Sequence, residues 1–223
     1  MSAREAMLGR IRRSLGTSGA DTARRAAVAD RLARAPRGVI PARGALPTAD
    51  RLALFEEMAR GAFADVVRTA SDAAPGIVAA YLAERELPAT IRIGDDARLH
   101  AIRWRDAGLA VETGTAEAGD LAAVSHAEAG IAETGTAMML SGAANPTLLN
   151  FLPLVHIVVV SAGDIVGDAE TALERIRQMY GKGAMPRCVN LVTGPSRSGD
   201  IEQTMYLGAH GPRDLLVLVL TDI

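Results

Sequence analysis

The stretch from Gly194 to Arg213 gathers polar side chains between two apolar runs. Those able to bind or titrate are Ser196, Arg197, Asp200, Glu202 and His210. Arginine offers a planar, bidentate donor for a carboxylate or phosphate, and serine adds a hydroxyl donor. The glycine that opens the stretch lets backbone N–H groups approach an anion, and a helical turn after it would add its positive end. The pattern fits either an anion-binding loop or a solvated turn capped by serine.

A second polar set, Glu133 to Thr136, precedes another apolar run. A glutamate beside threonines on a small-residue strand could act as a base or as a nucleophile towards an activated acyl group. The alternative is an exposed glutamate at a strand edge. Gly135 has no side chain to pack, which indicates the close approach of a ligand or of another stretch of backbone.

We take Glu133 and His210 as candidate catalytic residues. A histidine in such a loop suits proton transfer near neutral pH, with a histidine that only orders a turn as the alternative. The candidate substrate-binding residues are Thr134, Gly135, Thr136, Gly194, Ser196, Arg197, Asp200 and Glu202. The last two share a face only if their segment is extended, and no histidine cluster accompanies them, so we predict no metal site. His156 opens an apolar run and is interpreted as structural.

The residues around these polar sets predict short strands that alternate with helices. Strands are expected at residues 65–69, 90–93, 109–113, 156–160, 188–193 and 215–220. Helices are expected at residues 48–61, 73–84, 95–102 and 168–180. Residues 121–140 contain two small-residue runs, which predict strands or a helical turn leading into a strand. This alternation predicts an α/β domain with a mostly parallel sheet and helices on both faces.

In sheets of this kind, ligands bind outside the carboxyl ends of the strands. Each polar set follows or interrupts an apolar run. We therefore expect Glu133–Thr136, Ser196–Glu202 and His210 to converge on one cleft at that edge of the sheet.

Residues 1–47 predict a helical arm that precedes the compact domain at residues 48–223. Ala3 to Leu15 forms an amphipathic pattern with several arginines, and Asp21 is placed to cap a second helix. The proline-containing connector Pro36–Gly44 follows. The first helix is expected to dock on the body or on a partner protein, because its apolar face is short for a helix that lies on a membrane.

The composition excludes several classes of protein. The 223 residues are 49% hydrophobic, enough to bury a sizeable core. The formal charge of −2 shows no basic excess, so nucleic acid is not expected as the main partner. A single cysteine, Cys188, cannot form an intrachain disulfide or by itself hold an iron–sulfur cluster or zinc. No apolar run reaches the roughly 18 residues of a membrane span, and no hydrophobic leader is evident, so a cytoplasmic protein is expected. Dinucleotide, P-loop and α/β-hydrolase fingerprints are absent from the sequence.

Four stretches together resemble the LUD, or lactate-utilisation, domain family. They are Ala132–Thr136, Leu152–Val158, Gly194–Glu202 and Gly208–Pro212. The connector Pro36–Arg43 and the N-terminal helix are similar to the small branch called lactate utilisation protein C, which lacks iron–sulfur cysteines. The resemblance covers nearly the whole chain and implies a three-layer α/β/α sandwich similar to the NagB/RpiA/CoA-transferase class.

The resemblance implies a role in the bacterial oxidation of L-lactate to pyruvate, beside iron–sulfur partner proteins. In that role the chain would be a non-redox subunit that binds a small carboxylate or organises the complex, with iron–sulfur clusters in the partners and no cofactor of its own. One alternative is a stand-alone enzyme of acyl or CoA transfer, or of sugar-phosphate chemistry, that uses Glu133. Another is a scaffold or regulator without catalysis. The family brings no catalytic residue to this chain, so the candidate residues rest on their own chemistry.

Overall fold

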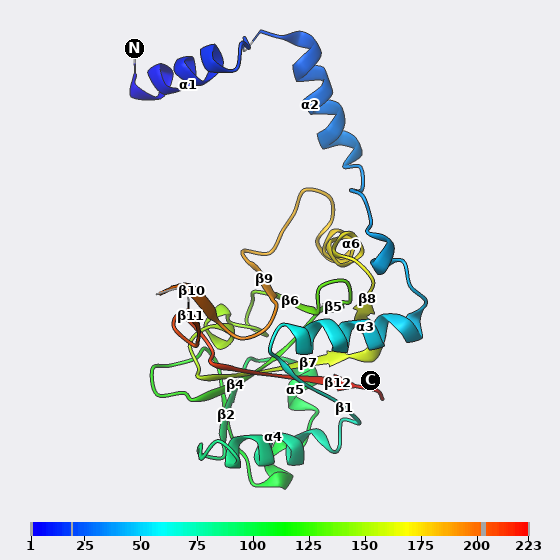
Figure 1. The fold of residues 1–223 in the computed structure, drawn as a ribbon, viewed down its shortest axis with the longest axis vertical. Coiled ribbons are helices and arrows are strands. Elements are labelled where there is room, and N and C mark those ends of the chain that lie inside the picture. Colours follow the sequence, from blue (N-terminus) through cyan, green and yellow to red (C-terminus); the bar gives the residue numbers. More distant parts are fainter. Residues whose placement is uncertain (1, 19, 202–203, 223) are drawn as a thin grey trace. The chain divides into compact units, whose positions relative to one another are not determined.

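The computed structural model describes residues 2–18, 20–201 and 204–222 (Figure 1). Contacts between residues divide the chain into two compact units, Met1–Val39 and Ile40–Ile223. Residues 40–47, which the sequence analysis placed with the arm, group with the larger unit. Gly44, for example, approaches the backbone of Gly167, so that a Cβ added at Gly44 would lie 3.0 Å from the Gly167 oxygen.

The smaller unit contains helices α1 (Ala3–Ser14) and α2 (Thr22–Arg34). Local capping explains where they begin, because Ser2 and Glu5 form a capping box and the Asp21 carboxylate accepts from the Arg24 N–H at 2.9 Å. Neither helix has a buried residue. Residues 1–39 carry nine arginines and three acidic residues, which is a formal charge of +6.

A six-stranded sheet forms the centre of the larger unit. Its order is β1 (Asp65–Thr69), β12 (Asp214–Leu220), β7 (Val155–Ser161), β4 (Ala122–His126), β2 (Thr90–Ile93) and β3 (Ala110–Thr113). Every neighbouring pair is parallel. Along β12, alternate residues enter the cores on opposite faces of the sheet, as expected for a strand covered on both sides. The predicted α/β class with a mostly parallel sheet is confirmed.

Helices cover both faces of this sheet (Figure 1). On one face, helix α4 (Ala74–Ala83), helix α5 (Ala97–His100) and the short helix η2 (Trp104–Ala107) enclose a core with β2, β7 and β12. On the other face, α3 (Thr48–Gly61) buries Phe55 and Ala59 against the central strands. The short helix η1 (Ala42–Gly44) leads into α3.

A second, four-stranded sheet lies over the face that α3 covers. Its order is β8 (Ile165–Val166), β5 (Ala129–Ile131), β6 (Thr136–Leu140) and β9 (Val189–Val192). Residues of β6 share a core with α3 and β7, and helix α6 (Ala169–Tyr180) packs on this sheet through Ala172 and Ile176. The short helices η3 (Thr147–Asn150) and η4 (Ala162–Asp164) flank β7 in the sequence.

The predicted strand at residues 188–193 forms, but not as a buried strand of the parallel sheet. It is β9, which pairs antiparallel with β6 and leaves Leu191 56% exposed. The small-residue run at 121–140 explains the difference. After β4 the chain leaves the central sheet and pairs with itself as β5 and β6, and β9 joins that pairing.

The polar stretch after Gly194 is a hairpin rather than a loop followed by a helical turn. Strands β10 (Arg197–Ile201) and β11 (Thr204–Leu207) pair antiparallel. The Ser196 N–H donates to Pro212 O at 2.8 Å and the Ser196 carbonyl accepts from the Gly208 N–H at 2.8 Å, which holds the two ends of the hairpin together. The expected contribution of a helix N-terminus to anion binding is therefore wrong at this position.

Across the residues that the structure describes, none of the helices has the length and apolar character needed to cross a membrane.

Candidate functional site

A cavity of about 250 Å³ lies beside the hairpin. It is smaller than the roughly 300–1,000 Å³ of sites for drug-sized ligands, and so suits a small molecule. Its lining comes from η3, β7, β9, β12 and the loops on both sides of the hairpin. The lining residues are Asn150, Phe151, His156, Leu191, Val192, Thr193, Gly194, Pro195, Ser196, His210, Gly211, Pro212 and Leu215.

The cavity lies at the amino ends of central strands, and not at their carboxyl ends as we predicted. His156 and Leu215 are the second residues of β7 and β12 and are paired in register. The residues after β9 also line the cavity, so the carboxyl end of β9 meets the amino ends of β7 and β12. The prediction failed because β9 belongs to the second sheet, to which the rule for parallel sheets does not apply.

Three buried polar side chains form a hydrogen-bonded chain at this cavity. The Ser125 hydroxyl donates to Asn150 Oδ1 at 2.7 Å, and Ser125 Oγ lies 3.1 Å from His156 Nε2. None of the three residues is more than 1% exposed. His156 Nδ1 and Asn150 Nδ2 have no hydrogen-bond partner within the described part of the chain.

Burial lowers the pKa of His156 to about 3, so its imidazole is neutral at physiological pH. Buried polar atoms in folded proteins are nearly always hydrogen-bonded, and each exception calls for an explanation. Here two such atoms belong to residues that line one cavity. Each of the two atoms is itself almost completely shielded from solvent.

No local sequence pattern had pointed to these three residues as a site. His156 was interpreted as structural, and Ser125 and Asn150 were not singled out. Ser125 lies 31 residues from His156 and 25 residues from Asn150 in the sequence, so the three form no local motif. Only the pairing of β4 with β7, and the return of the chain through η3, bring them together.

Three of the predicted site residues, Gly194, Ser196 and His210, line the same cavity. Gly194 has φ +79°, and a Cβ there would lie 1.9 Å from the Ala62 carbonyl oxygen at the end of α3. Only glycine permits both this conformation and this approach. The loop is thus held against α3 on one side and, through Ser196, against Pro212 on the other.

Two more predicted residues, Thr134 and Arg197, line a separate and more open hollow of about 480 Å³. Thr193 lines both hollows. Its hydroxyl lies 2.6 Å from that of Thr136, which lies 2.7 Å from that of Thr134. The Arg197 guanidinium donates to Thr193 O at 3.3 Å and lies 5.5 Å from the centre of the Phe63 ring.

Glu133 and Gly135 contact helices instead of a cavity. Glu133 is 6% exposed, and its Oε1 accepts from the Ala169 N–H at 2.9 Å, at the first turn of α6. A carboxylate there stabilises the positive end of the helix. Gly135 has φ +65° and packs against the backbone of α3, so the close approach predicted for it is that of another backbone segment.

The catalytic role of Glu133 stays a prediction. Among the described residues, Glu133 lines neither hollow. Of the two acids predicted beside Arg197, Asp200 belongs to β10 but its side chain is outside the description, and Glu202 lies outside the described residues.

The family model described as "LUD domain" matches residues 52–220. The chain belongs to the LUD domain family. The matched range includes the cavity and every predicted site residue, and excludes α1 and α2.

Curated relatives of this LUD domain include proteins named "Lactate utilization protein C". The one from Shouchella clausii is 34% identical over 92 residues, which cover 41% of this chain and 40% of that protein. The one from Bacillus subtilis is 33% identical over 100 residues, which cover 44% of this chain and 42% of that protein. The matches thus span less than half the length of these relatives.

A crystal structure of a DUF162 family protein from Deinococcus radiodurans has the same fold, with a TM-score of 0.60. It is 24% identical, and the match covers 78% of this chain and 99% of that one. The similarity to the NagB/RpiA/CoA-transferase class remains a prediction.

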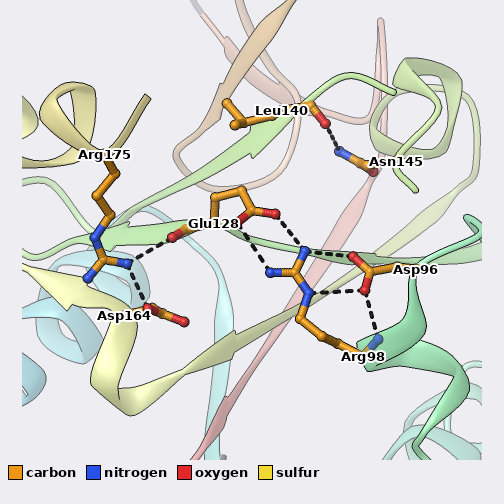
Figure 2. A network of polar contacts seen from close by, with 7 residues as sticks. All are labelled: Asp96, Arg98, Glu128, Leu140, Asn145, Asp164 and Arg175. Atoms are coloured by element: carbon orange, nitrogen blue, oxygen red, sulfur yellow. Dashed lines mark hydrogen bonds and ion pairs between the residues drawn. The ribbon is translucent and has the colours of Figure 1, made fainter. Parts of the chain in front are cut away.

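The carboxyl ends of β2 and β4 in this LUD domain hold a network of ion pairs (Figure 2). Arg98 donates to Asp96 at 2.7 Å and to Glu128 at 2.5 Å, and Arg175 joins the Glu128 carbonyl to Asp164. Burial raises the pKa of Asp96, but the hydrogen bonds from Arg98 outweigh it and hold the pKa below its usual value. At this edge of the sheet, where we expected the ligand, charged side chains thus pair with one another.

Proposed function

We propose that this LUD domain protein is a non-redox component of a bacterial lactate-utilisation system, and that it binds a small carboxylate in the 250 Å³ cavity. The names of its relatives support a role in lactate utilisation. The observation that carries the binding proposal is the pair of buried, unpartnered atoms, His156 Nδ1 and Asn150 Nδ2, in residues that line this cavity.

The chemistry of a small carboxylate suits the cavity. The Asn150 amide can donate to a carboxylate oxygen, and the imidazole of His156 can bond the substituent on the neighbouring carbon. Ser196 and His210 add a hydroxyl and a second imidazole to the lining. No arginine or lysine is among the lining residues described, so hydrogen bonds and burial would provide the affinity.

The oxidation of lactate to pyruvate removes two electrons, which must pass to another group. Cysteine is the side chain best suited to redox cycling, and it normally cycles through a disulfide with a second cysteine. Cys188 is the only cysteine, is half-buried, and donates to Asn190 Oδ1 at 3.3 Å. The proposal therefore assigns electron transfer to iron–sulfur partner proteins.

Replacing His156 with phenylalanine is expected to weaken L-lactate binding to the full chain at least 10-fold. The change removes the imidazole but keeps an aromatic ring of similar size. Isothermal titration calorimetry measures the affinity, and a ligand-induced shift in melting temperature provides a second readout. The matched control is His100→Phe, because His100 is exposed and pairs with Asp95 at 3.1 Å, away from the cavity. Equal lactate affinity in both variants would contradict the proposal, as would the absence of any small-carboxylate binding by the parent chain.

We also propose that α1 docks on an iron–sulfur partner. The formal charge of residues 1–39 is +6, whereas the rest of the chain has 15 basic and 23 acidic residues. Both helices of the smaller unit expose apolar side chains, including Met7, Ile11 and Leu32. A basic helix with an apolar stripe suits an acidic partner surface that has an apolar groove.

Deletion of residues 1–15 is expected to reduce co-purification with co-expressed iron–sulfur proteins at least 5-fold. The melting temperature should stay within about 2 °C, because α1 has no buried residue. Lactate oxidation should require the partners, and should fall with the deletion. An intact complex after the deletion would contradict only the role of α1, whereas lactate oxidation by the isolated chain would overturn the non-redox assignment.

A further inference from the structure

We infer that the cavity selects a 2-hydroxy acid over the corresponding 2-oxo acid, because Ser125 and Asn150 hold His156 Nδ1 as a hydrogen-bond acceptor. This inference rests on the proposed binding of a small carboxylate and adds a preference between the two members of the redox pair. Ser125 would then be a positioning residue, which acts on the ligand through His156.

The donor and acceptor of each hydrogen bond in this chain can be assigned by starting from Asn150. Its Oδ1 can only accept, so the single proton of the Ser125 hydroxyl points to Asn150. The hydroxyl oxygen then has only lone pairs to offer His156 Nε2, 3.1 Å away. The bond between them therefore needs a proton on Nε2.

A neutral imidazole carries one N–H, and a proton on Nε2 leaves a lone pair on Nδ1. The second proton that would turn Nδ1 into a donor is disfavoured, because His156 is fully buried. The hydrogen bond made by one ring nitrogen thus sets the role of the other. A ligand bound beside both residues would then meet an acceptor on His156 and a donor on Asn150.

A 2-hydroxy acid matches this pair, since its hydroxyl can donate to Nδ1 while its carboxylate accepts from Asn150 Nδ2. A 2-oxo acid has only acceptors at those positions, so its keto oxygen would face a lone pair and Nδ1 would stay unpaired. Sites built to bond a hydroxyl reject analogues without one by large factors, since a buried polar group is left unsatisfied. The reduced acid would be held and the oxidised product released.

The test compares L-lactate with pyruvate on the full chain by isothermal titration calorimetry. The expected result is that lactate binds at least 10-fold more tightly than pyruvate. In the ligand-free protein, long-range ¹H–¹⁵N correlation spectra should show the His156 ring protonated on Nε2. Both measurements use the parent chain, so they do not depend on a variant that folds.

The Ser125→Ala variant removes the hydroxyl that sets the tautomer. The preference for lactate should fall at least 5-fold, and the spectra should show a population with the proton on Nδ1. A role of Ser125 in stability alone would not move either readout. Ser161→Ala is the matched control, because Ser161 lies at the far end of β7, where its Oγ accepts from the Gly163 N–H at 3.2 Å. Its preference should equal that of the parent.

Each outcome decides between the two proposals. Equal affinity for the two acids, or a proton on Nδ1 in the parent, would overturn this inference and leave carboxylate binding intact. An unchanged preference in Ser125→Ala would overturn the role of Ser125. Failure of both acids to bind would overturn the proposed function and this inference together.

Discussion

The Gly135→Ala variant is expected to lose about 3 kcal/mol or more of its free energy of unfolding, since overpacking and a left-handed backbone each cost one to a few kcal/mol. An added Cβ would lie 2.2 Å from the backbone nitrogen of Ala59 and 2.5 Å from the carbonyl carbon of Met58. Both atoms belong to the helical backbone of α3, which cannot turn aside as a side chain can. The φ of +65° adds strain for any residue with a Cβ.

Urea denaturation at pH 7 measures this loss. The matched control is Gly61→Ala in the last turn of α3, where an added Cβ meets nothing within 4 Å. Alanine is favoured over glycine in a helix by up to about 1 kcal/mol, so the control should be as stable as the parent or more so. A Gly135→Ala protein of parental stability would show that β6 and α3 can move apart.

The second large effect is expected from Arg98→Met, which should lower the free energy of unfolding by about 2–3 kcal/mol. Removing one partner of a fully buried ion pair costs roughly 3–5 kcal/mol, and the figure is reduced here because the Arg98 side chain is 41% exposed. Asp96, whose side chain is 5% exposed, would lose its cationic partner, and Glu128 would lose the same guanidinium. Methionine keeps much of the apolar stem of arginine, so the change tests the charge more than the packing.

The effect of this variant should depend on pH. The pKa of Asp96 lies below its usual value in the folded protein, so its ion pair stabilises the fold above the unfolded pKa of about 3.9. That stability is lost as the pH falls through the folded pKa. The difference in free energy of unfolding between variant and parent should therefore become smaller below about pH 4. Urea denaturation at pH 7 and pH 3 compares the two.

Arg103→Met is the control for this charge effect. Arg103 is 78% exposed and pairs with Asp106 at 3.4 Å, so the expected change is below about 0.5 kcal/mol. A loss that is equally large at both pH values would attribute the effect of Arg98→Met to packing.

Many helices and strands of this protein could be predicted from local sequence. Strand β1 and helix α3 have the predicted bounds, and Asp21 caps α2 as expected. Strands β7 and β12 are apolar runs buried on both faces, which is the pattern of central parallel strands. Such features depend on residues a few positions apart, so the chain itself contains the whole signal.

The polar groups that could do chemistry were only partly predictable. Gly194, Ser196 and His210 form a dense local motif, and all three line the cavity. The motif did not reveal that its hairpin lies at the amino ends of β7 and β12. That position depends on the second sheet, in which β9 pairs with β6, about 50 residues away in the sequence.

The sequence by itself determined the fold class, the glycine-bounded polar motif and membership of the LUD domain family. Tertiary structure decided which side chains share a site. Ser125, His156 and Asn150 meet because β4 pairs with β7. The Glu133 carboxylate caps α6 because β5 pairs with β8, the strand just before that helix. The physical reason is that secondary structure follows from local periodicity, whereas contacts between distant residues depend on the register and order of strands, which no local pattern specifies.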